Sequence, residues 1–117
     1  MDYQTIDVAR SAEGLRLVLN AGVPGPWSEA AKALFNHHNV AFVPIAQAAG
    51  GANEDLVDWT GHRNAPIAVF EAEPPRTRWI EMLDLAERLG TGPSLLPQDR
   101  AERVQAIGWV NEMAGEG

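Results

Sequence analysis

The hydrophobic period changes twice in the first half of the chain, and this change constrains the fold more than any other feature. Apolar residues alternate along Leu15–Leu19, between turn residues, which predicts a short buried strand. From Pro26 the spacing becomes helical, and Pro26 is suited to the first helical position. One face of this expected helix gathers Trp27, Ala30, Ala31, Leu34, Phe35 and His38, with Ser28 on the opposite face.

A second apolar run, Val40–Pro44, is too short for a helix and predicts another strand, covered on both faces. A strand, a helix and a strand in this order indicate parallel strands with a right-handed crossover. Asn53 then predicts the cap of a short helix, and Ile67–Phe70 predicts a third strand. The prolines at 74 and 75 confine any fourth strand to a few residues around Glu71–Glu73, at an edge.

Helical spacing returns from Trp79 to Leu89, and Gly90 is expected to end that helix. The element order is therefore that of an α/β thioredoxin-like domain, β-α-β-α-β-(β)-α. One additional C-terminal helix is expected from Asp99, and its apolar face, with Trp109, lacks an obvious partner in this chain. Residues 1–13 show no convincing period and are interpreted as a tail or a weak edge strand.

Composition excludes several classes of protein. The chain has 117 residues and no cysteine, which rules out disulfides, thiolate metal sites and any mechanism with a thiol of its own. Sixteen acidic residues against nine basic ones disfavour nucleic acid and anionic membranes as partners. The sequence shows neither a membrane-spanning apolar stretch nor a signal-peptide pattern, so a cytoplasmic location is expected.

Four segments resemble motifs of one family, in the same order and at similar spacing. Residues 26–32 (PWSEAAK) resemble [S/C]-P-aromatic-[S/C]-x-x-[V/A]-[R/K], and residues 64–67 (NAPI) resemble x-V-P-x-L. Residues 77–80 (TRWI) resemble E-S-x-x-I, and residues 93–97 (PSLLP) match P-x-L-L-P. The family is that of the cytosolic glutathione S-transferases. The first three motifs resemble its N-terminal domain, and the fourth resembles its linker into the all-helical second domain.

The resemblance implies a domain organisation. Residues 14–92 would be the thioredoxin-like glutathione-binding domain, and residues 93–117 the linker and first part of a truncated all-helical domain. It also implies a cis bond between Ala65 and Pro66, although an arbitrary X-Pro bond is more often trans. Ala65 would then pair antiparallel with the cysteinyl part of glutathione.

Other ligand contacts follow from the same resemblance. Thr77, at a helix start, is suited to the γ-glutamyl carboxylate, and an ordinary helix cap is the alternative. His62 and Arg63 are candidates for the glycyl carboxylate, or are simple loop charges. Trp27 stacks on the ligand or belongs to a core or interface.

Two positions depart from the family pattern. Gly25 stands where the family has its thiol-activating Ser or Cys, so a thiolate would depend on the Gly25 N–H, on Ser28 or on the helix dipole. Ser28 is otherwise a solvent-facing serine of the first turn. Arg76 replaces an acidic residue and would clamp a ligand carboxylate, or else is a solvated surface arginine.

The sequence does not favour a metal or nucleotide site. His37 and His38 are adjacent on a helix and point in different directions, so they cannot grip one metal ion. The glycine-containing segments at residues 22–26 and 50–51 lack the glycine pattern of a phosphate-binding loop, which disfavours nucleotide binding.

We therefore expect a glutathione-binding, glutathione S-transferase-like homodimer, with conjugation of glutathione to an electrophile as the inherited chemistry. The alternative is a non-catalytic binding or assembly module of the same fold. Gly25 favours that alternative, whereas Thr77 and Ala65-Pro66 favour the first reading. The sequence leaves open whether the chain is an enzyme.

Overall fold

The computed structural model describes residues 2–22, 25–48 and 50–91. The expected linker and last helix, residues 93–117, lie outside the described residues. The described elements are, in order, α1 (Ile6–Ser11), β1 (Leu15–Ala21), α2 (Pro26–His37), β2 (Val43–Ala48), α3 (Glu54–Thr60), β3 (Ile67–Phe70) and α4 (Trp79–Leu89).

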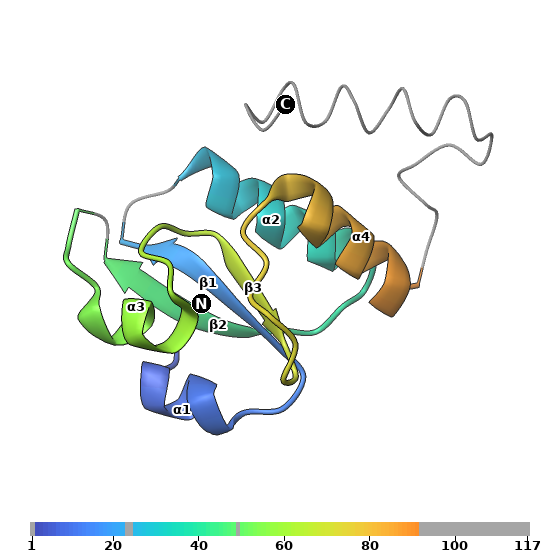
Figure 1. The fold of residues 1–117 in the computed structure, drawn as a ribbon. Helices are drawn as coiled ribbons and strands as arrows, with labels where there is room; N and C mark the ends of the chain where they lie inside the picture. The colour runs from blue at the N-terminus through green and yellow to red at the C-terminus, as the bar shows by residue number, and fades with distance from the viewer. Residues whose placement is uncertain (1, 23–24, 49, 92–117) are drawn as a thin grey trace.

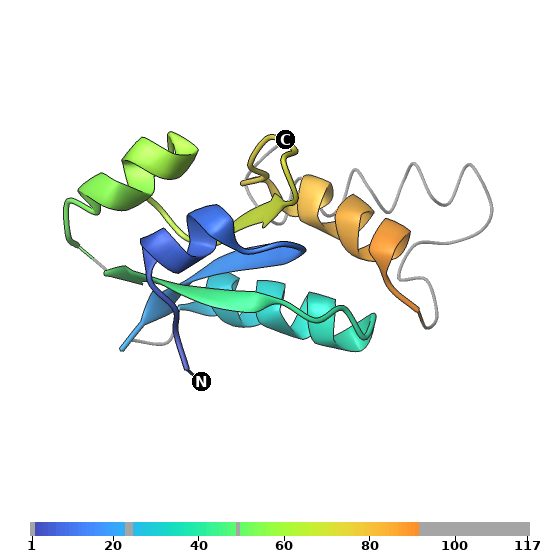
Figure 2. The same ribbon diagram turned by 90° about the horizontal axis from the view of Figure 1, so that it is seen from below.

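The three strands form one sheet in the order β2-β1-β3. β2 runs parallel to β1, and β3 runs antiparallel to it, with Val18 paired to Ile67. Helices α2 and α4 cover one face of the sheet, and α1 and α3 cover the other (Figures 1 and 2). The expected parallel pairing of the two strands that α2 connects and the thioredoxin-like arrangement are confirmed.

The central strand β1 carries the core because it is covered on both faces. Leu17 and Leu19 pack with Phe35 of α2 and with α4, whereas Val18 packs with α1 and α3 on the opposite side. All five residues from Leu15 to Leu19 are buried. The buried run in the sequence therefore reflects the central position of the strand.

The prediction for residues 1–13 was wrong over most of its length. Helix α1 occupies Ile6–Ser11, and the hydroxyl of Thr5 caps it by accepting from the Val8 N–H at 3.3 Å. A helix of fewer than two turns is too short to show a hydrophobic period. Of the expected edge strand, only a single bridge between Gln4 and Ile45 is present in the described residues.

Strand β2 differs from the strand expected at Val40–Pro44 in its position and in its burial. It begins three residues later than predicted and is an edge strand. Ile45 and Gln47 are buried, while Ala46 and Ala48 are exposed, so the strand is not covered on both faces. Val40 still belongs to the turn that leaves α2, since its N–H donates to the Phe35 carbonyl at 2.9 Å.

No fourth strand forms at Glu71–Glu73 within the described residues, because this segment is a turn. Pairing resumes beyond the prolines, at Arg76, whose N–H and carbonyl bond to Ala68 at 2.8 Å in both directions. The fourth strand of the thioredoxin-like pattern is thus reduced to one bridge.

Two residues of α2 exchange their predicted environments. Trp27 was placed on the buried face, yet half of its surface is exposed. Ser28 was placed opposite, yet it is buried. The helical spacing predicts which face of α2 is buried on average, and the first turn departs from it because Ser28 contacts the end of β1.

No helix of the described part is long and apolar enough to cross a membrane.

Candidate functional site

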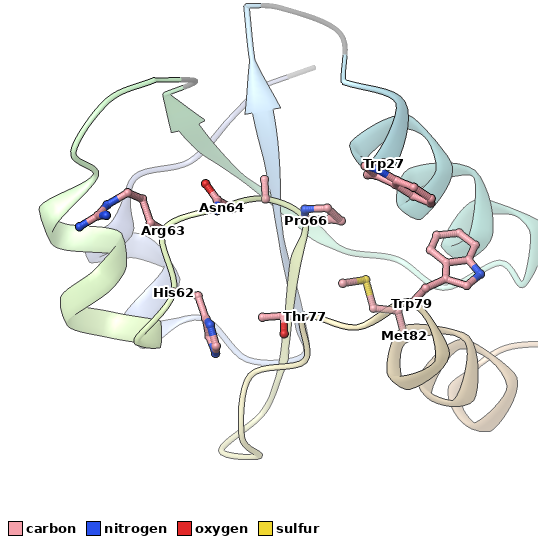
Figure 3. Close-up of a pocket in the computed structure, with 9 residues that line it drawn as sticks. Trp27, His62, Arg63, Asn64, Pro66, Thr77, Trp79 and Met82 are labelled. Atoms are coloured by element: carbon pink, nitrogen blue, oxygen red, sulfur yellow. The ribbon is translucent and has the colours of Figure 1, made fainter. Parts of the chain in front are cut away.

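A cavity of about 340 Å³ opens beside the start of β3 (Figure 3). Its walls come from the first turn of α2, the segment between α3 and β3, and the start of α4. The lining residues are Trp27, His62, Arg63, Asn64, Ala65, Pro66, Thr77, Trp79 and Met82.

The Ala65–Pro66 bond is cis, as the resemblance implied. Among the described residues, no hydrogen bond uses the main-chain N–H or the carbonyl of Ala65. Both groups belong to a residue that lines the cavity and is only half-buried. A cavity-lining residue with unpaired main-chain groups can accept an extended peptide as an additional strand.

Thr77 lies one residue before the cap of α4. The cap is Arg78, whose N–H donates to the Glu81 carboxylate at 3.0 Å. The ordinary-cap alternative therefore applies to Arg78 and not to Thr77. Within the described part of the chain, the Thr77 hydroxyl and N–H make no hydrogen bond, so both remain available at the cavity wall.

The segment that carries His62 and Arg63 is held in place by its main chain. The Thr60 hydroxyl bonds both the N–H and the carbonyl of His62, at 3.0 and 3.1 Å. The Arg63 carbonyl accepts from Gln47 Nε2 at 3.0 Å. The two side chains are exposed, and Arg63 uses only its Nε, which donates to the Ala52 carbonyl at 3.1 Å. Figure 3 shows the guanidinium turned away from Pro66 and Thr77, toward the segment that carries Ala52.

The opposite wall is apolar. The indole rings of Trp27 and Trp79 lie 6.4 Å apart between centroids, tilted by 57°, and the buried Met82 lies beside them. Figure 3 shows this group on one side of Pro66 and Thr77, with His62 and Arg63 on the other. Sequence analysis did not identify Trp79 or Met82 as site residues, because their helical spacing indicated only a packed face.

Gly25 and Ser28 do not line this cavity in the described structure. Gly25 caps α2 and its carbonyl accepts from the Glu29 N–H at 3.0 Å. The Ser28 hydroxyl accepts from the Asn20 N–H at 3.1 Å and is buried. Ser28 is thus not solvent-facing, and its position gives it a role in joining α2 to β1.

Arg76 also points elsewhere. Its Nη2 donates to Glu73 Oε1 at 2.7 Å, and Arg88 donates to both oxygens of the same carboxylate at 3.0 Å. These bonds, the Arg76 bond foremost, hold the pKa of Glu73 below its usual range. Since its partner is already a carboxylate, the expected clamp on a ligand has no support from the placement of Arg76.

Comparison with known proteins identifies the fold that carries this cavity. No family model matches the sequence, and no curated protein matches it. A Tau-class glutathione S-transferase from mango, Mangifera indica, matches over 82% of this chain and 43% of its own, with 21% identity and a TM-score of 0.66. A glutathione transferase homolog from Burkholderia gl BGR1, with bound glutathione, matches over 81% and 52%, with 15% identity and a TM-score of 0.62.

The fold is that of glutathione S-transferases. This chain spans about half the length of the structures it matches. Six of the residues selected from the sequence line the cavity together: Trp27, His62, Arg63, Ala65, Pro66 and Thr77. Among the described residues, no group of three or more His, Asp or Glu side chains is placed to hold a metal ion.

Proposed function

We propose that this chain is a glutathione-binding domain of glutathione S-transferase type. The observation that carries the proposal is the convergence of unpaired groups on one cavity. The main chain of Ala65 and the hydroxyl and N–H of Thr77 are unpaired among the described residues, and all line the same hollow. Unpaired donors and acceptors at a cavity wall fit a polar, extended ligand.

Each part of glutathione has a complementary group here. The cysteinyl unit pairs with the N–H and carbonyl of Ala65 in the manner of an added strand. The γ-glutamyl carboxylate meets the hydroxyl and N–H of Thr77. The glycyl carboxylate lies nearest the positive charge of Arg63, with His62 beside it. Arg63 matters particularly because the chain as a whole carries a charge of −7, which disfavours an anionic ligand.

The chemistry that such binding serves is conjugation. The bound thiol loses its proton to water, and the thiolate donates its electron pair to an electrophilic carbon. A carbon–sulfur bond forms while the leaving group departs with its own electron pair. Trp27 and Trp79 offer an apolar surface for an electrophile at the cavity. A homodimer in the cytoplasm is part of this proposal, and light scattering of the purified chain tests the dimer.

A second candidate is a non-catalytic binding or assembly module. Gly25 favours it, because glycine has no hydroxyl or thiol with which to stabilise a thiolate. Assay of conjugation to a chromogenic aryl halide separates the two candidates. A chain that binds glutathione but does not accelerate conjugation above the rate in buffer belongs to the second.

Titration calorimetry with glutathione tests binding itself. We expect Thr77→Val to weaken binding about tenfold, because it removes one hydroxyl that bonds a charged group while keeping the shape. Thr91→Val is the matched control, since Thr91 is exposed and lies outside the cavity. We expect Arg63→Gln to weaken binding about fivefold, and Arg10→Gln on α1 to leave it unchanged. Absence of heat at millimolar glutathione contradicts the proposal.

A further inference from the structure

The carboxamide of Asn20 occupies the space that a side chain at residue 25 would fill. A β-carbon placed on Gly25 would overlap Asn20 Nδ2 and would lie 3.4 Å from Asn20 Cγ. A side chain at position 25 would therefore have to turn the Asn20 carboxamide out of the space that it occupies beside Gly25.

Asn20 also lies at the level of the proposed ligand. Val18 of β1 pairs with Ile67 of β3 in antiparallel register. Asn20 and Ala65 each lie two residues beyond this last pair, at the same end of the two strands. Asn20 does not line the cavity itself, so its link to the thiol is through the space beside Gly25, where the resemblance places the thiol-activating side chain.

The main chain of Asn20 is fixed while its side chain is not. Its N–H donates to the Ser28 hydroxyl at 3.1 Å, and its carbonyl accepts from the Tyr3 hydroxyl at 3.2 Å. In the described ranges, the carboxamide itself makes no hydrogen bond. A half-buried amide with unused donors on an anchored backbone is suited to bind a ligand atom.

We propose that Asn20 replaces the side chain that is missing at residue 25, and that its Nδ2 donates a hydrogen bond to the sulfur of bound glutathione. This inference rests on the proposed function of the cavity. An N–H donor stabilises the thiolate more than the thiol, so the pKa of the bound thiol falls and its proton passes to water. Asn20 is then a catalytic residue, and Gly25, which has no side chain, leaves the space that its amide occupies.

The test measures the pKa of bound glutathione from the ultraviolet absorbance of its thiolate as pH is raised. We expect Asn20→Ala to raise this pKa by about one unit, which corresponds to a tenfold smaller ionisation constant. S-methylglutathione has no thiol to ionise, so its affinity should change less than twofold. A purely structural role of Asn20 would weaken both ligands equally and would overturn the inference.

A paired substitution tests the exchange of side chains directly. Gly25→Ser alone introduces a side chain into the space held by Asn20, and we expect it to lower the melting temperature. In the double variant Asn20→Ala with Gly25→Ser, that space is free for the serine. We expect the double variant to recover both the melting temperature and a lowered pKa of the bound thiol, because a hydroxyl then stands where the amide was.

The outcomes separate the two proposals. If the unaltered chain does not bind glutathione, the proposed function fails and this inference fails with it. If the chain binds glutathione and Asn20→Ala leaves the thiol pKa unchanged, the inference alone is overturned. If the double variant melts no higher than Gly25→Ser, the two side chains do not compete for one space, which also overturns it.

Discussion

The Ser28 hydroxyl and the Asn20 N–H are joined by a hydrogen bond of 3.1 Å between the first turn of α2 and the end of β1. Ser28 is 4% exposed, so the bond is shielded from water. It fixes how α2 begins relative to the sheet. Because Trp27 precedes Ser28 and lines the cavity, this bond also sets the position of one cavity wall.

Ser28→Ala leaves the Asn20 N–H without its partner. We expect the free energy of unfolding to fall by about 1–3 kcal/mol, the cost of an unpaired buried donor. Urea denaturation measures the change. Ser11→Ala is the control, since that hydroxyl is exposed and bonds only carbonyls of its own helix. Equal stability of the two variants would contradict a structural role for Ser28.

Trp27→Ala should affect ligand binding more than folding. The side chain is 50% exposed, so its removal costs the folded state about 1 kcal/mol or less, including the contact with Trp79. We expect affinity for glutathione to fall about threefold or more, as measured by calorimetry. Val8→Ala on α1, another exposed apolar side chain, should alter neither quantity. A large loss of stability with unchanged affinity would refute the assignment of Trp27 to the ligand.

Acid should weaken the fold through Glu73. Its pKa is lower in the folded state than the ordinary value of 4.5, because Arg76 and Arg88 bond the carboxylate. The ionised Glu73 carboxylate therefore makes its full contribution to stability at neutral pH. This contribution is lost as the pH falls below 4.5, the ordinary pKa, and then through the lower pKa of the folded state. We expect Glu73→Gln to lower the urea midpoint near neutral pH and to match the unaltered chain in acid. Added salt should reduce the difference, since the Glu73 side chain is partly exposed to solvent.

The control for that experiment is Glu13→Gln, which removes an exposed carboxylate outside the Glu73 cluster. Its effect on the urea midpoint should be small at both pH values. A Glu73 variant as stable as the Glu13 variant at neutral pH would show that the two arginine contacts contribute nothing measurable.

Gly90→Ala should destabilise the chain where α4 ends. A β-carbon there would overlap the β-carbon of His38 and lie 2.6 Å from the His38 carbonyl oxygen and 2.8 Å from that of Ala86. Two of these neighbours are main-chain atoms, so relief requires the α2 and α4 ends to move apart. We expect a loss of about 1–3 kcal/mol in urea denaturation, typical of overpacking. Asp84→Ala, at an exposed position of α4, should change stability by less than about 0.5 kcal/mol.

Periodicity predicted the elements that pack most fully. β1, α2, β3 and α4 were all expected from apolar spacing, because their buried residues recur over enough positions to show a pattern. Helix α1 is too short for this, and only its Thr5 cap was a local signal. β2 begins later than expected for a different reason: the apolar run that starts at Val40 belongs partly to the turn after α2.

The cavity residues whose position depends on the main chain were predicted from the motifs. The residues whose side-chain partners come from other parts of the fold were not. Pro66 and Thr77 were located from their motifs alone. Arg76 could not be, because its nearest carboxylate, Glu73, is brought to it by the turn and not by the spacing of a helix or strand. The carboxamide of Asn20 gave no signal, since its contact with Gly25 exists only in three dimensions.

The two single bridges at the borders of the sheet have a consequence for how copies of this chain meet. Gln4 occupies a main-chain position on the outer side of β2, and Arg76 does so on the outer side of β3. A foreign strand would need to displace one of these residues before it could run along either border. Edge-to-edge pairing between two copies is thereby discouraged at these two positions.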